Sequence, residues 1–229
     1  MNTTLRIAEI FHSLQGEGQF VGIPTVFVRT TGCNLRCWFC DTEYTSWNPQ
    51  GAPQTIDEIV ETVESFDCEH VDITGGEPLL QSNVVELSDT LKQRGHFITV
   101  ETAGTLFRPV VADLIALSPK LANSTPDDQS WSKKHDSLRD RPDVIMQFVQ
   151  KYHYQLKFVI DEPADLDEVA QYLRRFPEIP PQRVLLMPQA TTAEQLTAKN
   201  EWLESAASRL GYQVSPRLHV ALYGNERGR

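Results

Sequence analysis

Residues 33–40 read Cys33-Asn-Leu-Arg-Cys37-Trp-Phe-Cys40, a segment with three cysteines in the spacing C-x3-C-x2-C. The chain has one other cysteine, Cys68. Structural zinc sites and ordinary cysteine-ligated clusters are closed by four ligands. Three thiolates without a neighbouring fourth favour a [4Fe–4S] cluster, in which one iron stays open to a further ligand. The alternative is a zinc ion with Cys68 or a histidine as its fourth ligand.

The rest of the chain has the composition of one sizeable globular domain, and we expect a single domain over residues 1–229. Its 21 basic and 31 acidic side chains give a net charge of −10, which argues against a stable complex with nucleic acid. The N-terminus lacks the apolar core of a signal peptide, and no apolar run approaches the length that crosses a membrane. Because no disulfide pairing is suggested, we expect a reducing, cytoplasmic setting.

Apolar runs that suit buried strands alternate with segments that suit helices. Thr55-Ile-Asp-Glu58 is a capping box that opens a helix ending near Ser65, and Thr192 with Gln195 opens the last predicted helix. The Ser- and Asp-rich stretch 123–134 is expected to be a loop, and the tail 224–229 to be disordered. We expect strands at 26–28, 70–74, 97–102, 114–118, 154–160, 183–188 and 213–220, and further helices at 83–94, 141–152 and 165–175.

Repeated strand–helix units predict an α/β fold with a parallel sheet. About six such units are too few for a complete eightfold barrel, so we expect a partial, splayed parallel (βα)6-like barrel. Parallel α/β proteins bind their ligands at the carboxyl ends of the strands. Motifs that are polar or rich in glycine follow five of the predicted strands, and each alone is also typical of a turn. Together they predict a ligand site: 33–40, Gly75-Gly76-Glu77-Pro78, 101–104, 118–120 and 187–189.

The cysteine spacing and the Gly-Gly-Glu-Pro motif together resemble the radical S-adenosylmethionine (SAM) superfamily. The resemblance implies a [4Fe–4S] cluster on Cys33, Cys37 and Cys40, with the amino acid end of SAM on the open iron. It also implies the partial barrel described above. The SAM-binding residues that it implies are Phe39, Cys40 and Asp41 on the adenosine side, Gly75, Gly76 and Glu77 at the amino group, and Gly104, Ser118, Pro119, Lys120, Pro188 and Gln189 on the remaining walls.

A second motif narrows the range of possible substrates. The chain carries Leu14-Gln15-Gly16-Glu17-Gly18 near its N-terminus, Arg29 at the end of a predicted strand, and Cys40-Asp41-Thr42 at the end of the cysteine segment. This layout resembles the 7-carboxy-7-deazaguanine synthase family, and the match runs through nearly the whole chain. It implies a radical carbon–nitrogen lyase that converts 6-carboxy-5,6,7,8-tetrahydropterin to 7-carboxy-7-deazaguanine with loss of ammonia, in queuosine and other deazapurine pathways. SAM would act there as a recycled cofactor.

The same resemblance implies roles for substrate and metal ligands. Arg29 offers a planar fork of donors to the substrate carboxylate, a salt bridge being its alternative role. The Gln15 amide can read a donor and an acceptor together, whereas Glu17 has the alternative of capping its loop. Thr42 is expected to bind Mg2+ beside the substrate carboxylate, and its alternative is a helix or turn cap. The implied substrate-binding residues are Leu14, Gln15, Gly16, Glu17, Arg29 and Thr102.

The resemblance also implies a homodimer, a small-molecule pterin substrate and an external electron donor such as a flavodoxin, with no nucleic acid or membrane partner. We expect His219 to be structural and Cys68 to be a packing residue. A glycyl-radical-enzyme activase shares the cysteine spacing, but residues 14–18 and Arg29 speak against it. A non-catalytic iron–sulfur or zinc module would explain the cysteines but not the other motifs at strand ends.

Overall fold

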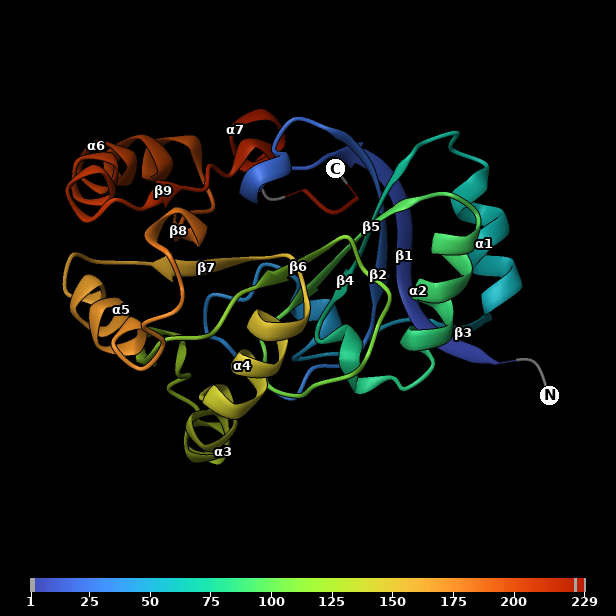
Figure 1. Ribbon diagram of the computed structural model, residues 1–229, viewed down its shortest axis with the longest axis horizontal. Coiled ribbons are helices and arrows are strands. Elements are labelled where there is room, and N and C mark those ends of the chain that lie inside the picture. Colours follow the sequence, from blue (N-terminus) through green and yellow to red (C-terminus); the bar gives the residue numbers. More distant parts are fainter. Residues whose placement is uncertain (1–2, 225, 229) are drawn as a thin grey trace.

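The computed structural model describes residues 3–224 and 226–228 of the chain. These residues contain nine strands that form one open sheet, in the order β3-β1-β2-β4-β5-β6-β7-β8-β9 (Figure 1). The strands are β1 (Thr4–Leu14), β2 (Pro24–Thr30), β3 (Ala52–Thr55), β4 (His70–Gly75), β5 (Phe97–Thr102), β6 (Leu114–Leu117), β7 (Tyr154–Ile160), β8 (Val184–Pro188) and β9 (Gln213–Val214). The helices in this part of the chain are α1 (Ile56–Glu64), α2 (Val84–Gln93), α3 (Gln129–Arg139), α4 (Pro142–Lys151), α5 (Asp165–Leu173), α6 (Ala193–Leu210) and α7 (Leu218–Tyr223).

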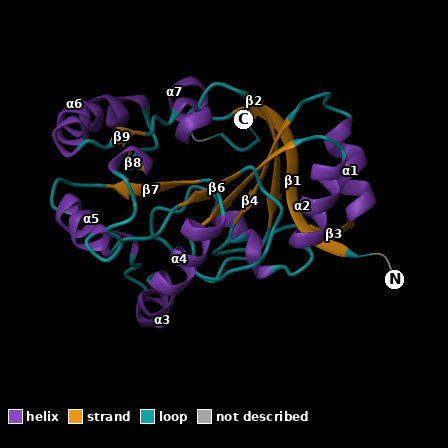
Figure 2. Ribbon diagram, viewed as in Figure 1, coloured by secondary structure: helices purple, strands orange, loops and turns teal. Residues whose placement is uncertain are grey.

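The sheet is parallel from β2 to β9, whereas β1 pairs antiparallel with both β2 and β3. Figure 2 shows the strands fanned across the molecule, with α1 and α2 beside one end of the sheet and α5 and α6 beside the other. The sheet does not close on itself. This architecture is the partial, splayed barrel that the sequence predicts.

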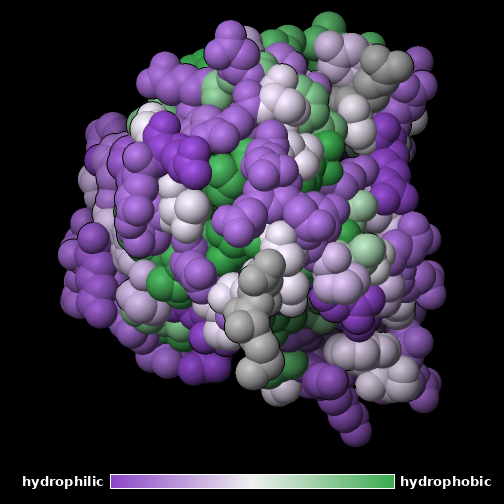
Figure 3. All heavy atoms as spheres, turned by 90° about the vertical axis from the view of Figure 1, so that its right-hand side faces the viewer, coloured by the Kyte–Doolittle hydropathy of each residue, from purple (hydrophilic) through white to green (hydrophobic). Residues whose placement is uncertain are grey.

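Burial explains why the parallel strands read as apolar runs. Every residue of β7 and of β8 is buried, because helices and loops cover both faces of these strands. α1 contributes Ile59 and Val63 to the same core, and neither side chain is exposed. The side of the molecule in Figure 3, where α1 and α2 lie, is mainly hydrophilic, with apolar side chains interspersed. Both helices therefore have an apolar inner side and a solvated outer side.

The predicted helix boundaries have the expected local causes. Glu58 N–H donates to the Thr55 side chain and Thr55 N–H donates to the Glu58 carboxylate, so the capping box is formed. The Thr192 hydroxyl accepts from Gln195 N–H at the start of α6. Gly95 follows α2 with φ of 92°, a conformation that glycine adopts without steric cost.

Two predictions about secondary structure are wrong. The stretch expected to be a loop at 123–134 contains the start of α3, where the Asp128 side chain accepts from Ser130 N–H as an N-cap. Its only fully buried side chain is His135, so no apolar stripe marks this helix. The strand expected at 213–220 ends at Val214, because Pro216 has no N–H to continue the ladder, and α7 follows.

β1 and β3 are two strands that were not predicted from the sequence. β1 spans the first part of the chain and is partly exposed along most of its length, so its apolar pattern is weak. The tail expected to be disordered is described in part, since residues 225 and 229 lie outside the described residues. Within it, Arg227 Nε donates to Glu9 Oε2 at 2.9 Å, and its guanidinium lies over the Tyr44 ring at 4.0 Å.

Candidate functional site

A cavity of about 270 Å³ lies at the carboxyl ends of the parallel strands. The strand-end motifs that are far apart in sequence meet there, as the sequence predicts. Most of the predicted site residues line it: Leu14, Gln15, Gly16, Glu17, Arg29, Cys33, Cys37, Phe39, Cys40, Asp41, Thr42, Gly75, Gly76, Thr102, Ser118, Lys120 and Gln189. Four predicted residues are not among the lining side chains: Glu77, Gly104, Pro119 and Pro188.

Two of the three clustered cysteines have a hydrogen-bond partner in the surrounding loops. Leu35 N–H donates to Cys33 Sγ at 3.4 Å, and the Ser46 hydroxyl lies 3.2 Å from Cys40 Sγ. Burial raises the pKa of Cys33 to about 12 and that of Cys37 to about 11. A coordinated metal deprotonates such thiols, and the donors then stabilise the thiolates. The donor set therefore fits a thiolate-ligated cluster.

Cys68 lies apart from this group. Its Sγ donates to the carbonyl of Pro24, at the amino end of β2, whereas Cys33 follows the carboxyl end of the same strand. It does not line the cavity.

Glu77 lies behind the cavity wall and organises it. Its carboxylate accepts from Thr102 Oγ1 at 2.9 Å, from Ala103 N–H at 2.9 Å and from Leu79 N–H at 3.2 Å, and only 1% of the residue is exposed. Burial raises the pKa of Glu77 to about 7. Gly104 N–H in turn donates to Thr102 Oγ1 at 3.0 Å. These bonds hold together the loops that follow β4 and β5.

The Gln15 side chain is used by the protein itself. Its Nε2 donates to Asp72 Oδ2 at 2.7 Å, and its Oε1 accepts from Glu17 N–H at 3.1 Å. The amide that the sequence analysis assigned to substrate reading is therefore already bonded on both sides. Gln15 shapes the loop 14–18, which carries Glu17 into the cavity.

Arg29 lines the cavity and also makes the salt bridge that the sequence left as an alternative. Its Nε donates to Glu9 Oε1 at 2.8 Å, and its guanidinium lies 5.5 Å from the centre of the Phe11 ring. Tyr44 Oη donates to the same Glu9 oxygen at 2.6 Å. Glu9 thus orients Arg29. Within the described residues the other guanidinium donors of Arg29 make no hydrogen bond, so an anion in the cavity could accept from them.

Thr42 lies beside the cysteine segment, with its Oγ1 3.8 Å from Cys40 Sγ. It precedes a short 3-10 helix, Glu43–Thr45, but its side chain makes no capping hydrogen bond there. The capping role left open by the sequence is therefore not what this hydroxyl does.

A buried group of charged residues was missed by the sequence analysis. Glu17 makes a short ion pair with Lys157 Nζ, and its Oε1 lies 3.4 Å from Arg217 Nε. Although burial acts to raise it, the two cations hold the pKa of Glu17 well below its usual range. Lys157 could have been noticed in the sequence, because it is the only charged residue in the apolar run Leu-Lys-Phe-Val-Ile at 156–160.

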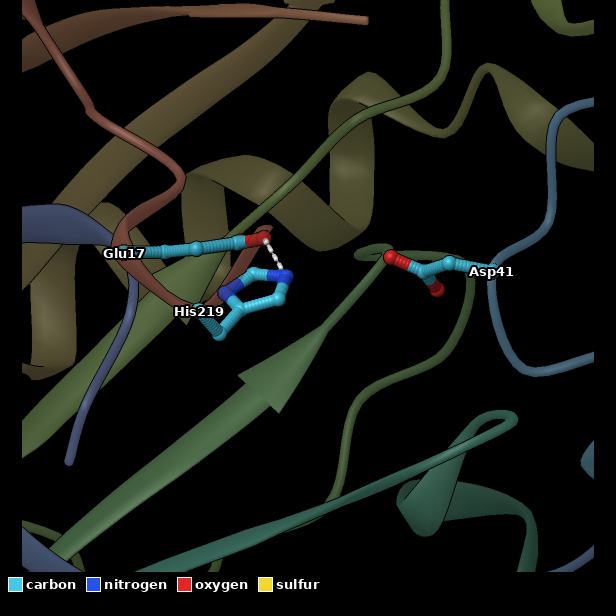
Figure 4. A group of neighbouring side chains, drawn as sticks. All are labelled: Glu17, Asp41 and His219. Carbon is cyan, nitrogen blue, oxygen red and sulfur yellow. Dashed lines mark ion pairs between the residues drawn. The ribbon is translucent and has the colours of Figure 1, made fainter. Parts of the chain in front are cut away.

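His219, which was expected to be structural, lies in the cavity wall. Its Nε2 is 3.8 Å from Glu17 Oε1, and Asp41 faces the pair from the cysteine segment (Figure 4). Burial lowers the pKa of His219. A Cβ on Gly16 would overlap the His219 ring, so a larger residue at this position would force the His219 side chain to move. Ligand atoms of the two acids and the histidine all lie within 4.8 Å of one another, but Lys157 and Arg217 already supply positive charge to this group.

None of the helices in the described part of the chain combines the length and apolar character needed to span a membrane.

Comparisons with known proteins show the family of the chain. Residues 27–123 match the model of the radical SAM superfamily. The chain is 43% identical to a 7-carboxy-7-deazaguanine synthase of Halobacterium salinarum over 96% of its own length and 91% of the relative's. It is 44% identical to a synthase of the same name from Rhodopirellula baltica, over 99% of its own length and 89% of the relative's. The crystal structure of QueE from Escherichia coli shares the fold, with a TM-score of 0.73 and 21% identity over 94% of this chain and 95% of that one.

The cysteine segment, the strand-end cavity and the near full-length similarity lead to one conclusion. The chain belongs to the 7-carboxy-7-deazaguanine synthase family of radical SAM enzymes.

Proposed function

We propose that this enzyme converts 6-carboxy-5,6,7,8-tetrahydropterin to 7-carboxy-7-deazaguanine with loss of ammonia, as a carbon–nitrogen lyase of queuosine or another deazapurine pathway. The observation that carries the proposal is the position of Arg29. Its guanidinium shares one cavity with the three cysteines, so a carboxylated substrate bound to it would lie beside the cofactor. Family membership argues against the glycyl-radical-enzyme activase and the non-catalytic module.

The cofactor residues follow from the thiolate donor set. Cys33, Cys37 and Cys40 would hold the [4Fe–4S] cluster, which together with SAM supplies the radical chemistry. Phe39, Asp41, Gly75 and Gly76 line the same cavity and would bind SAM with Ser118, Lys120 and Gln189. Glu77 and Gly104 do not line the cavity. They would act indirectly, by shaping the loops whose other residues line it. We assign Pro119 and Pro188 only to the walls behind them.

On the substrate side, Arg29 would bind the carboxylate through the donors that Glu9 leaves free. Leu14, Gly16, Glu17 and Thr102 line the cavity around it, and Gln15 would contribute through the loop that it holds. Thr42 would offer its hydroxyl to Mg2+, a weak ligand that fits an ion held mainly by substrate and water.

The test is anaerobic reconstitution with iron and sulfide, followed by assays with and without the carboxypterin. We expect about four irons per chain, SAM cleavage that depends on a reductant, and deazaguanine formation only with the pterin. SAM cleavage without any deazaguanine product would overturn the proposed substrate but not the family. A colourless zinc protein would overturn the cofactor assignment.

Two further features are proposed from the resemblance. We expect a single radical SAM domain that forms a twofold homodimer, since an open sheet leaves edges that a partner can cover. Sedimentation would contradict the dimer if it showed only a 26.0 kDa species at micromolar concentration. We also expect a small external electron donor, such as a flavodoxin, to reduce the cluster.

A further inference from the structure

Arg217 connects two sides of the cavity through one buried guanidinium. Its Nη2 donates to Asp41 Oδ2 at 2.5 Å, and its Nη1 donates to the carbonyl of Ala190 at 2.6 Å. Its Nε lies 3.4 Å from Glu17 Oε1. The Arg217 side chain is 5% exposed, whereas its partner Asp41 is 39% exposed, so the guanidinium is buried although the Asp41 carboxylate reaches solvent. The loop 14–18 and the cysteine segment 33–42 are therefore joined by one planar group.

One of the three contacts is incomplete. Arg217 Nε is buried and makes no hydrogen bond within the described residues, although Glu17 lies nearby. A buried donor without a partner is destabilising, so a small shift of Glu17 toward Arg217 would be favourable. The guanidinium is rigid, and the same group is bonded to Asp41 at short distance. A movement of Glu17 is thus transmitted to Asp41, and a movement of Asp41 is transmitted to Glu17.

The charges around Arg217 show why the connection between the two loops depends on this residue. Glu17 and Asp41 bring two negative charges, and Lys157 and Arg217 bring two positive charges. Lys157 pairs with Glu17, but Asp41 has its short ion pair with Arg217. Without Arg217, Glu17 would keep a cation and Asp41 would lose its own, so the two loops would no longer be held to one another.

We propose that Arg217 couples the binding of the pterin substrate to the binding of SAM, so that each ligand raises the affinity of the cavity for the other. The proposal rests on the proposed function, which places Glu17 on the substrate side and Asp41 on the SAM side. A ligand that draws Glu17 toward Arg217 also fixes Asp41, and a ligand that fixes Asp41 also positions Glu17. Thermodynamic linkage requires that the two effects be equal. Arg217 acts here as a positioning residue.

The experiment measures affinities in the cluster-loaded enzyme without a reductant, so that SAM is not cleaved. The SAM dissociation constant is determined with and without saturating 6-carboxy-5,6,7,8-tetrahydropterin, and the pterin dissociation constant with and without saturating SAM. We expect the wild type to show the same ratio in both directions, in the range of about 5- to 150-fold. In Arg217→Gln both ratios should fall toward one. Arg217→Lys, which keeps the charge but loses the fork, should lie between the two.

Two further variants keep the test decisive. Asp41→Ala removes the acceptor of the same link from the other side and should also lower the ratio, which guards against a misfolded Arg217 variant. Arg175→Gln is the matched control, because Arg175 pairs with Asp140 at the surface, 2.7 Å away and outside the cavity. It should keep the wild-type ratio. A merely structural role for Arg217 would weaken both ligands uniformly and leave the ratio unchanged.

The possible failures are distinguishable. Wild-type enzyme that binds both ligands with a ratio near one would overturn the coupling and leave the proposed function intact. An unchanged ratio in Arg217→Gln would also overturn it. Wild-type enzyme that binds SAM but no carboxypterin would overturn the proposed substrate, and the coupling with it.

Discussion

Gln15 Nε2 donates a hydrogen bond of 2.7 Å to Asp72 Oδ2, across 57 residues of sequence. Both side chains are buried, and the second Asp72 oxygen, Oδ1, has no hydrogen bond within the described residues. The pair ties the loop 14–18 to the middle of β4. Asp72 does not line the cavity but acts on it through Gln15. The Gln15 amide bonds Asp72 on one side and the backbone N–H of Glu17 on the other.

Replacing Asp72 tests this relationship. Asp72→Val leaves the Gln15 amide buried without its acceptor, and we expect a loss of about 1–3 kcal/mol in the free energy of unfolding. The Michaelis constant for the carboxypterin should rise with it. Asp72→Asn keeps an acceptor oxygen and should restore both quantities toward wild type. Urea denaturation and steady-state kinetics measure the two effects, and equal behaviour of both variants would contradict the role of the bond.

The cysteine assignment makes a separate prediction. Alanine at position 33, 37 or 40 should abolish cluster assembly and SAM cleavage, because each thiolate is one of three protein ligands. Cys68→Ala should retain both, since Cys68 lies at the opposite end of β2 from Cys33. Iron content and visible absorbance after anaerobic reconstitution measure this. Loss of the cluster in Cys68→Ala would show that the ligand set is wrong.

Arg29→Ala tests the carboxylated substrate. Charge-assisted hydrogen bonds contribute about 1.5–3 kcal/mol, so carboxypterin affinity should fall roughly ten- to a hundredfold. SAM binding should persist, because Arg29 is assigned to the substrate alone. The Mg2+ dependence should weaken, since the ion and Arg29 would share one carboxylate. Undiminished deazaguanine formation beside normal SAM binding would remove Arg29 from the site.

The buried Glu77 predicts a pH effect on stability. Its pKa is raised by burial from 4.5 to about 7, so the folded protein binds this proton more tightly than the unfolded chain. The free energy of unfolding therefore falls as the pH rises from 4.5 to about 7. Glu77→Gln cannot lose that proton, and relative to it the wild type should lose on the order of 3 kcal/mol over this range.

Denaturation of wild type and Glu77→Gln across this pH range measures the difference in their free energies of unfolding. Only the change of this difference with pH tests the prediction. Glu61→Gln, which makes the same substitution at an exposed position of α1, is the matched control. A constant difference between wild type and Glu77→Gln would mean that Glu77 does not titrate there.

Much of the fold was predictable because its elements carry local signals. The parallel strands are apolar runs followed by glycine or polar motifs, and α1 and α6 begin at recognisable caps. These same strand ends brought the cysteines, Gly75, Arg29 and Thr102 into one cavity, as predicted. α3 escaped prediction because its buried face is essentially one histidine, His135, whose ring bonds Ser124 and Arg36.

The remaining part of the site depends on contacts between distant segments. Nothing near Arg217 in sequence indicates that it meets Asp41, 176 residues away. The Gln15 amide faces inward only because Asp72 stands opposite it in the folded sheet. A sequence motif shows which residues recur together, but the direction of a side chain is set by partners elsewhere in the chain.

Two segments far apart in sequence meet at the cavity, where Leu218 N–H donates to the carbonyl of Gly16 at 2.9 Å and His219 packs against Gly16. α7 leaves the ribosome after every strand of the described sheet, because it follows all of them in sequence. The nascent chain can therefore fold its sheet before the cavity has its full wall. Shortening the chain before α7, or fusing a tag just after Arg227, would disturb the site while leaving the core of the sheet to fold.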